Sequence, residues 1–420
     1  MTLCSLALDL RRIASSTIRL ARALPVVVPV AVGLSSPAVA QSSGVFRIGL
    51  ATDMSSGYSD FTGKGSVAAV QMAIEDFGGT VLGKKIELLT ADHQLKPSVG
   101  SAIVTDWFDR DNVSMALGLA GSSVALAVQA IAKERPKKLL IHTVAQTSDL
   151  AGKSCLPNSI HWTPDFYALA VAVTKHVTEH GKRTWYVMIQ DTAAGPPARA
   201  AALRGIASGG GKAVGEIAVP LNAGDMSSYV LQAQASGAAN VAIGFAGVDM
   251  VNVVKAGTAF GLPQMGITFA SLSMFNSALR SMGLELGQGI VFTTPFYEEW
   301  NDQTRAWSKR FRERTGQSPD YTHVGEYEAT LHYLKAVQAV GTDDASVVVP
   351  AMKANPIDTI AMKGGVIRAD NQLVRPMYLA KAKAPSASKG PNDLFEVIGT
   401  VPPEEAFSPL SESDCPMVKK

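Results

Sequence analysis

Short apolar runs alternate with longer amphipathic segments along most of the chain. The runs are rich in Val, Ile and Leu and have the length of buried strands. In the segments that follow, apolar residues recur every three to four positions, which is typical of helices with one buried face. The sequence therefore predicts repeated strand and helix units, which build parallel sheets covered by helices on both faces.

The pattern falls into two series of such units. The first series predicts strands at 45–50, 85–89, 113–118 and 138–143 and helices at 67–77, 98–108 and 124–132. The second series predicts strands at 184–189, 214–219, 241–245 and 266–269 and helices at 166–178, 197–207, 226–235 and 249–260. Helices are then expected at 304–314 and 326–340, returning strands at 377–381 and 394–398, and a surface excursion at 381–393. We predict an α/β fold of two similar lobes.

The residues before this pattern form a separate segment. Four arginines precede an uncharged apolar run at 24–34, and Ala38 and Ala40 provide the small residues of a cleavage site. The run is shorter than the roughly 20 residues that a membrane-spanning helix needs. We expect residues 1–40 to be a cleavable signal peptide and the mature protein to be exported. The pair Arg11-Arg12 leaves a twin-arginine route open beside the general one.

Length and charge exclude several classes of protein. A chain of 420 residues is too long for a small disulfide-stapled scaffold, and its 47% of hydrophobic residues is ordinary for a globular protein. Lys and Arg number 38 against 36 Asp and Glu, a net charge of +2, and loss of the signal peptide with its four arginines and Asp9 leaves −1. A nucleic-acid binder needs a basic field, so we expect no nucleic-acid partner.

Two cysteines remain after removal of the signal peptide, which contains Cys4. Cys155 and Cys415 form an even pair in an oxidising compartment, and we predict one disulfide between them. Two buried free thiols are the alternative, which is less favoured because Cys415 lies in a polar tail beside Pro416.

Known enzyme signatures are incomplete in this sequence. Residues 78–84 fit G-x-x-x-x-G-K, but Lys85 replaces the required Ser or Thr and the order is helix, turn, strand. His176 to His180 fit the zinc-peptidase pattern H-x-x-E-H, yet they lie in the last turn of a predicted helix, where imidazoles interact favourably with the helix dipole. We expect no metal, no cofactor and no enzymatic activity, and an α/β hydrolase ranks last among the alternatives.

Ligand sites of open α/β sheets lie beyond the carboxyl ends of the strands, so two facing sheets create a cleft between their loops. The loop at 53–63 is rich in hydroxyls and carries two aromatic residues that can contact an apolar ligand. At 121–123 a serine N-cap is expected before a helix, whose free N–H groups suit a carboxylate. The loop at 145–149 adds further donors. Alternatively, the serines only cap a helix and the loops only reverse the direction of the chain, without a role in ligand binding.

Two further segments carry a family resemblance. Residues 47–55 and 68–79 resemble the opening of type I periplasmic binding proteins of the branched-chain amino-acid (Leu/Ile/Val-binding) transporter class. The similarity continues at 155–162, 220–222, 232–238, 301–307, 332–337 and 415–416. It is strongest to the branch associated with aromatic and other organic acids. The resemblance implies two Rossmann-like lobes joined by three crossovers, which we place at 45–162 plus 295–375 and at 163–294 plus 376–414.

The resemblance also assigns candidate ligand-binding residues on the first lobe. The carboxylate contacts of the family fall on Ser122, Ser123, Ala145 and Thr147, with Gln146 beside them. Its contacts from the first loop fall on Ser55, Tyr58 and Phe61, which completes the set for this lobe.

On the second lobe the candidates are Asp191, Ala194, Val248, Asp249 and Ser271. The family has an aromatic residue where Ala194 stands, so the departure implies a roomier or differently shaped pocket here. The amino-acid binders have an acidic residue in the segment that contains Ser271, and its absence disfavours an amino acid as the ligand. Asp249 is expected mainly to cap the helix that follows, with pairing to a ligand cation as the alternative.

The implied function is ligand capture by hinge closure. A small carboxylate binds to the helix terminus of the first lobe, and closure adds contacts from the second lobe. Delivery to an inner-membrane ABC permease follows from the resemblance. A periplasmic location is expected from the cleavable signal peptide, and we expect a monomer. The alternative from another class is an exported sensor domain of a signalling system.

Overall fold

The structure is a computed structural model that describes residues 44–419. The predicted signal peptide and Cys4 lie outside the described residues. Two large sheets and a two-stranded one organise the described part of the chain. Among these residues, no helix combines the length and apolar character needed to cross a membrane.

The first large sheet has the strand order β2-β3-β1-β4-β5-β6. Its strands are β1 (Val45–Thr52), β2 (Thr80–Val81), β3 (Lys84–Asp92), β4 (Val113–Gly118), β5 (Leu139–His142) and β6 (Ser159–His161). All neighbours pair in parallel except β2, which runs antiparallel to β3. The middle strands β4 and β5 are buried along their whole length because helices cover both faces of the sheet.

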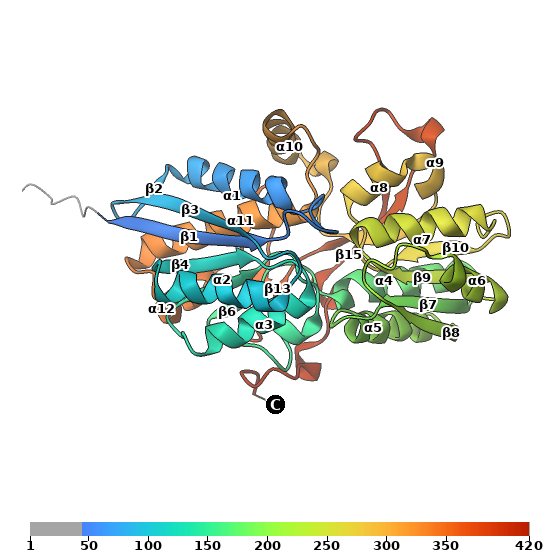
Figure 1. The fold of residues 1–420 in the computed structure, drawn as a ribbon, viewed down its shortest axis with the longest axis horizontal. Coiled ribbons are helices and arrows are strands. Elements are labelled where there is room, and N and C mark those ends of the chain that lie inside the picture. Colours follow the sequence, from blue (N-terminus) through green and yellow to red (C-terminus); the bar gives the residue numbers. More distant parts are fainter. Residues whose placement is uncertain (1–43, 420) are drawn as a thin grey trace, which may run out of the picture. The chain divides into compact units, whose positions relative to one another are not determined.

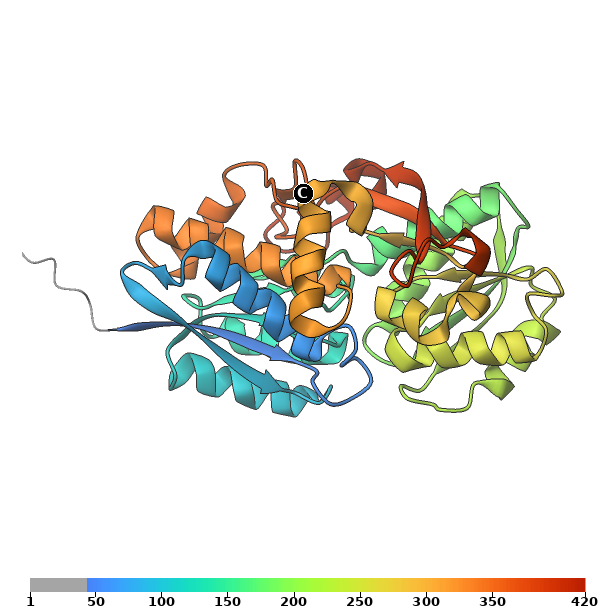
Figure 2. The ribbon, with the colours of Figure 1, turned by 90° about the horizontal axis from the view of Figure 1, so that it is seen from above.

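Six helices accompany the first sheet, and together they form what we call the first lobe. These are α1 (Gly63–Phe77), α2 (Pro97–Asp109), α3 (Ser122–Lys133), α10 (Asp302–Thr315), α11 (Tyr321–Val340) and α12 (Ala345–Lys353). Alternate residues of one strand serve the two faces: Met115 and Leu117 join the core under α11, while Ala116 joins the core under α2 and α3. Figures 1 and 2 show these two helix layers on opposite faces of the sheet.

The second large sheet has the order β15-β14-β11-β10-β9-β7-β8. Its strands are β7 (Thr184–Gln190), β8 (Lys212–Val219), β9 (Asn240–Gly244), β10 (Thr268–Ser271), β11 (Val291–Thr294), β14 (Met377–Ala382) and β15 (Phe395–Val401). At one edge β14 pairs antiparallel with both of its neighbours, β11 and β15, and the remaining pairs are parallel. This sheet and its helices form the second lobe.

In the second lobe, too, each helix layer packs on its own face of the sheet and forms a core of its own there. One layer contains α4 (Phe166–Glu179) and α5 (Gly195–Ser208), and the other contains α6 (Ser227–Ala235), α7 (Gly247–Ala259) and α8 (Asn276–Met282). Trp185 and Val187 face the first layer, whereas Tyr186 and Met188 face the second. The remaining elements are α9 (Leu284–Gly287), α13 (Pro403–Ala406), β12 (Val366–Ile367), β13 (Leu373–Val374) and the 3-10 turns Ser148–Leu150, Glu298–Trp300, Pro385–Ala387 and Leu410–Glu412.

The predicted α/β fold is confirmed, and every predicted strand and helix has a counterpart within a few residues. The elements that were not predicted are β2, β6, β11, β12, β13, α8, α9, α12, α13 and the 3-10 turns. Most of them are too short to show a period, and α12 contains Pro350, which is unfavourable inside a helix. The predicted disulfide is also confirmed, because Cys155 and Cys415 are bonded with their Cα atoms 5.6 Å apart.

The chain passes between the lobes three times, as predicted: from β6 to α4, after β11, and from β13 to β14. The third crossover is bonded to both of the others. Gln372 Nε2 donates to the carbonyl oxygens of His161 and Thr163, each at 3.2 Å, and Arg375 Nη2 donates to the carbonyl oxygen of Pro295 at 3.0 Å. The residue boundaries given above for the lobes stay a prediction.

Arg375 also forms a buried ion pair with Glu328 of α11, with 3.4 Å between Nη1 and Oε2. Replacing Arg375 by Ala leaves the Glu328 carboxylate buried without its partner, so we expect the free energy of unfolding to fall by about 3–5 kcal/mol. Denaturant unfolding measures this loss. The exposed Arg305, which pairs with Asp302, is the matched control, because its replacement by Ala should cost about 1 kcal/mol or less.

The double variant Arg375→Ala/Glu328→Gln tests the cause of that loss. Because Gln carries no charge to leave unpaired, the double variant should be more stable than Arg375→Ala alone. Equal unfolding midpoints for the single and double variants would contradict this account.

A second buried carboxyl group, that of Glu326 on α11, has no hydrogen-bond partner for either oxygen among residues 44–419. Burial raises the pKa of Glu326 from 4.5 to about 8. The folded protein therefore holds the proton more tightly than the unfolded chain. The resulting stability is fully present below pH 4.5 and is lost as the pH rises toward 8.

Glu326→Gln keeps the shape of the neutral acid and removes its titration. We expect its melting temperature to exceed that of the wild type by at least about 2 °C at pH 8 and to match it near pH 4. Glu134→Gln, at an exposed position that ends α3, should change neither value. Melting curves between pH 4 and pH 9 decide the matter, and a constant difference between Glu326→Gln and wild type across that range would refute the assignment.

Candidate functional site

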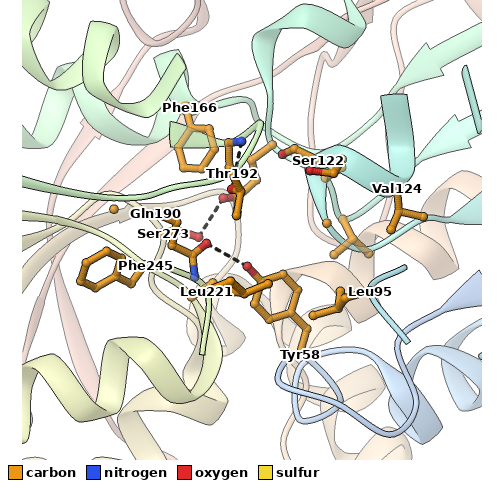
Figure 3. A pocket seen from close by; sticks show the side chains of 18 of the residues that line it. Tyr58, Leu95, Ser122, Val124, Phe166, Gln190, Thr192, Leu221, Phe245 and Ser273 are labelled. Atoms are coloured by element: carbon orange, nitrogen blue, oxygen red, sulfur yellow. Dashed lines mark hydrogen bonds between the residues drawn. The ribbon is translucent and has the colours of Figure 1, made fainter. Parts of the chain in front are cut away.

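A cavity lies where the carboxyl ends of the two parallel sheets face each other, and Figure 3 shows its lining side chains. The space between its lining atoms totals about 610 Å³, and this figure includes open solvent. From the first lobe it is lined by Tyr58, Phe61, Leu95, Gly121, Ser122, Ser123, Val124, Val144, Ala145 and Gln146. From the second lobe it is lined by Phe166, Gln190, Thr192, Ala194, Leu221, Gly244, Phe245, Ala246, Ser273 and Phe275.

The start of helix α3 forms one wall of the cavity. The expected serine N-cap is wrong, because Gly121 occupies the N-cap position and Ser122 is the first helical residue. Gly121 has a φ of 85°, a conformation that glycine adopts without a steric cost. The first N–H groups of a helix have no acceptor within it, so those of Ser122, Ser123 and Val124 can bind a ligand anion at the positive end of the helix dipole.

Aromatic rings from both lobes interleave beside the cavity. Phe275 of the second lobe lies between two rings of the first lobe, Phe61 and Tyr321. The ring centroids are 3.8 Å apart for Phe61 and Phe275 and 4.9 Å apart for Phe275 and Tyr321, and both pairs are stacked. Phe61 and Phe275 also line the cavity, which gives it an apolar wall suited to a ring or an alkyl body.

Two hydrogen-bond networks connect the lobes across the same region. Ser273 Oγ donates to Gln146 Oε1 at 2.8 Å, and Gln146 Nε2 donates to the hydroxyl of Tyr321. In the second network, Tyr58 Oη donates to Gln190 Oε1 at 2.9 Å, as Figure 3 shows. Burial raises the pKa of Tyr58 above its usual value, so this phenol keeps its proton and acts as a donor.

Asp249 supports the cavity from behind. It does not cap α7 as expected, because Ala246 is the N-cap and Asp249 lies in the first turn of that helix. Its Oδ2 accepts from the backbone N–H of Asn222 at 2.9 Å and from Gln190 Nε2 at 3.2 Å. Asp249 is buried, and burial raises the pKa of its carboxyl group. Asp249 is outside the cavity lining and fixes Gln190, which belongs to it.

Asp320 provides another contact between the lobes. This buried residue of the first lobe precedes α11, and its carboxylate accepts from the backbone N–H groups of Asn276 and Ser277, where α8 of the second lobe begins. Burial raises the pKa of Asp320 to about 6. One carboxylate thus connects the starting ends of two helices.

Seven of the candidate ligand-binding residues line the cavity: Tyr58, Phe61, Ser122, Ser123, Ala145, Gln146 and Ala194. The other six, including Asp249, do not. Ser55 is exposed and donates to Asp92, and Thr147 is buried and accepts from the N–H of Asp149. Asp191 and Val248 are exposed, and Ser271 turns toward Met250, with 3.8 Å between Oγ and Sδ.

Several lining residues that were not predicted stand near the predicted ones. Gln190 precedes Asp191, and Ser273 stands two positions beyond Ser271. Phe245 and Leu221 follow strands that were predicted correctly, and this position after a strand was the available signal. Phe275 precedes α8, which was itself missed.

No group of three or more His, Cys, Asp or Glu side chains within residues 44–419 is arranged to hold a metal ion. What the site offers instead is a helix start, an apolar wall and hydrogen bonds between two lobes. These features define a protein that binds a small solute between two α/β lobes.

Comparisons with known proteins identify the family. The sequence model described as periplasmic binding protein matches residues 45–391, so the chain belongs to the periplasmic binding proteins. It is of the ABC transporter type, and members of this family are solute-binding proteins, which confirms the prediction that the chain is not an enzyme. No protein in the search of curated proteins matches the chain.

Solved structures agree with this assignment. A periplasmic binding protein from Burkholderia mallei has a TM-score of 0.87 and 36% identity, over 89% of this chain and 99% of the other. A branched-chain amino acid ABC transporter periplasmic ligand-binding protein from Burkholderia xenovorans LB400 has a TM-score of 0.79 and 39% identity, over 89% and 100%. An ABC transporter solute-binding protein from Rhodopseudomonas palustris BisB5, in complex with 3,4-dihydroxybenzoic acid, shares the fold at 22% identity and a TM-score of 0.78, over 86% and 98%.

Proposed function

We propose that this protein captures a small carboxylate, an aromatic or other organic acid, between its lobes and delivers it to an inner-membrane ABC permease. The observation that carries the proposal is the start of α3, whose free N–H groups line the cavity opposite an apolar wall. The carboxylate of such a ligand complements the free N–H groups, and its ring or alkyl chain complements the apolar wall. The complex of the Rhodopseudomonas protein with a dihydroxybenzoic acid supports the same ligand class.

The proposed cycle is hinge closure. The lobes are 45–162 plus 295–375 and 163–294 plus 376–414, and the ligand binds first to the start of α3. Closure then adds contacts from the second lobe, so a ligand that touches both lobes favours the closed form. A micromolar dissociation constant, about −8 kcal/mol, is sufficient for scavenging. We further propose export by the signal peptide at 1–40 into the periplasm and action as a monomer.

The ligand class is tested by melting the protein with a panel of carboxylates and amino acids. Benzoates or aliphatic acids should raise the melting temperature, because a ligand that binds only the folded state stabilises it. No shift with any carboxylate would refute the proposal, and a shift with amino acids alone would replace it by amino-acid binding.

The role of the α3 start is tested with two variants of one residue. Ser122→Ala removes a hydroxyl, and Ser122→Pro also removes an N–H, at a helix position that proline tolerates. We expect Ser122→Pro to bind benzoate at least about tenfold more weakly than Ser122→Ala, because a hydrogen bond to a charged group is lost. Ser228→Ala, at an exposed position on α6, is the control, and calorimetry measures the affinities. Equal affinities of the two Ser122 variants would place the carboxylate elsewhere.

A further inference from the structure

Three side chains form a chain of hydrogen bonds from the interior of the second lobe to the cavity. Asp249 and Gln190 are buried, and Gln190 Nε2 donates to Asp249 Oδ2 at 3.2 Å. Gln190 Oε1 in turn accepts from Tyr58 Oη at 2.9 Å. Gln190 and Tyr58 line the cavity, whereas Asp249 does not.

The charge of Asp249 fixes the direction of this chain. An ionised carboxylate only accepts hydrogen bonds, so the nitrogen of the Gln190 amide must face Asp249 and its oxygen must face Tyr58. The N–H of Asn222 holds the same carboxylate oxygen at 2.9 Å, which prevents Asp249 from turning away. The phenolic proton of Tyr58 is already used in its bond to Gln190.

Besides the second N–H of Gln190 Nε2, the groups that remain available to a ligand on this wall are lone pairs. Gln190 Oε1 has one lone pair left beside its bond to Tyr58, and the Tyr58 oxygen has its own. In Figure 3, Tyr58 and Gln190 lie in a different part of the cavity lining from Ser122. A ligand whose carboxylate binds at the start of α3 thus meets an acceptor surface at another point of the cavity.

We propose that Asp249, Gln190 and Tyr58 make the site select carboxylates that carry a second group with a hydrogen-bond donor, a hydroxyl or an amine. This rests on the proposed function. A donor completes the bonding of the two oxygens, whereas an ether or methyl group at that place leaves buried acceptors unpaired. Tyr58 and Gln190 determine specificity by contact, and Asp249 is a positioning residue that acts through Gln190.

The test compares matched ligands by calorimetry at pH 7.5. The probes are benzoate, 3- and 4-hydroxybenzoate, and 3- and 4-methoxybenzoate, which differ in the donor they present. For the wild type we expect at least one hydroxybenzoate to bind about tenfold or more tightly than its methoxy counterpart. Equal affinities within both pairs would overturn the inference and leave the proposed function standing. No binding of any probe would refute the proposal of aromatic acids and this inference with it.

Two variants then test the chain itself. Asp249→Asn keeps the shape but allows the Gln190 amide to reverse, and Gln190→Met removes the acceptor at similar size. Both should reduce the preference for hydroxybenzoate over methoxybenzoate to less than about threefold, and this ratio is the readout whatever the absolute affinity for benzoate becomes. Asp225→Asn, the same change at an exposed position of the second lobe, should retain the preference.

The ratio of affinities separates positioning from a structural role, because a loosened fold would weaken all five probes together. If Asp249→Asn does not fold, Gln190→Met decides alone. A preference that survives in Gln190→Met overturns the inference, and so does one that survives in folded Asp249→Asn.

Discussion

Both faces of each parallel sheet are covered by helices, and this constraint determines where a ligand can be bound. The residues in the middle of the strands are committed to the cores, as the division of Met115 and Ala116 between two clusters illustrates. Only the strand ends remain free for recognition. Because parallel strands end at the same edge, the loops after β1, β4 and β5 bring Tyr58, Ser122 and Gln146 to one cavity wall.

The same constraint explains how much the sequence could predict. Strands of five or more buried residues produce continuous apolar runs, so the lobes and most of their elements could be found. The helix start at Gly121 to Ser123 could be located, but its N-cap residue could not, since that depends on the φ angle of Gly121. Neighbouring side chains along a strand point in opposite directions. A site prediction that is wrong by one position therefore names the exposed Asp191 in place of Gln190, which lines the cavity. Contacts such as Phe61 with Phe275 join residues more than 200 positions apart, and no local pattern reveals them.

The contacts between the lobes are of different kinds. The stack of Phe61, Phe275 and Tyr321 removes apolar surface from water, whereas Asp320 supplies charge-assisted bonds to the start of α8. Each of them depends on the lobes being close together. In the proposed hinge closure, their summed free energy sets the balance between closed and open forms, and a ligand shifts that balance only by its own difference in affinity for the two.

Buried charged side chains lie at the crossovers and behind the cavity, where they hold neighbouring groups in place. Arg375 and Glu328 lie in the first lobe, and Arg375 holds the carbonyl of Pro295 on the neighbouring crossover. A buried ion pair contributes little net stability, but breaking it is costly, so it resists rearrangement. In the proposed hinge closure, that resistance keeps the crossovers in a fixed relation. Asp249 shows the same principle within a lobe, because its contacts with Asn222 and Gln190 leave the amide of Gln190 with one favourable orientation.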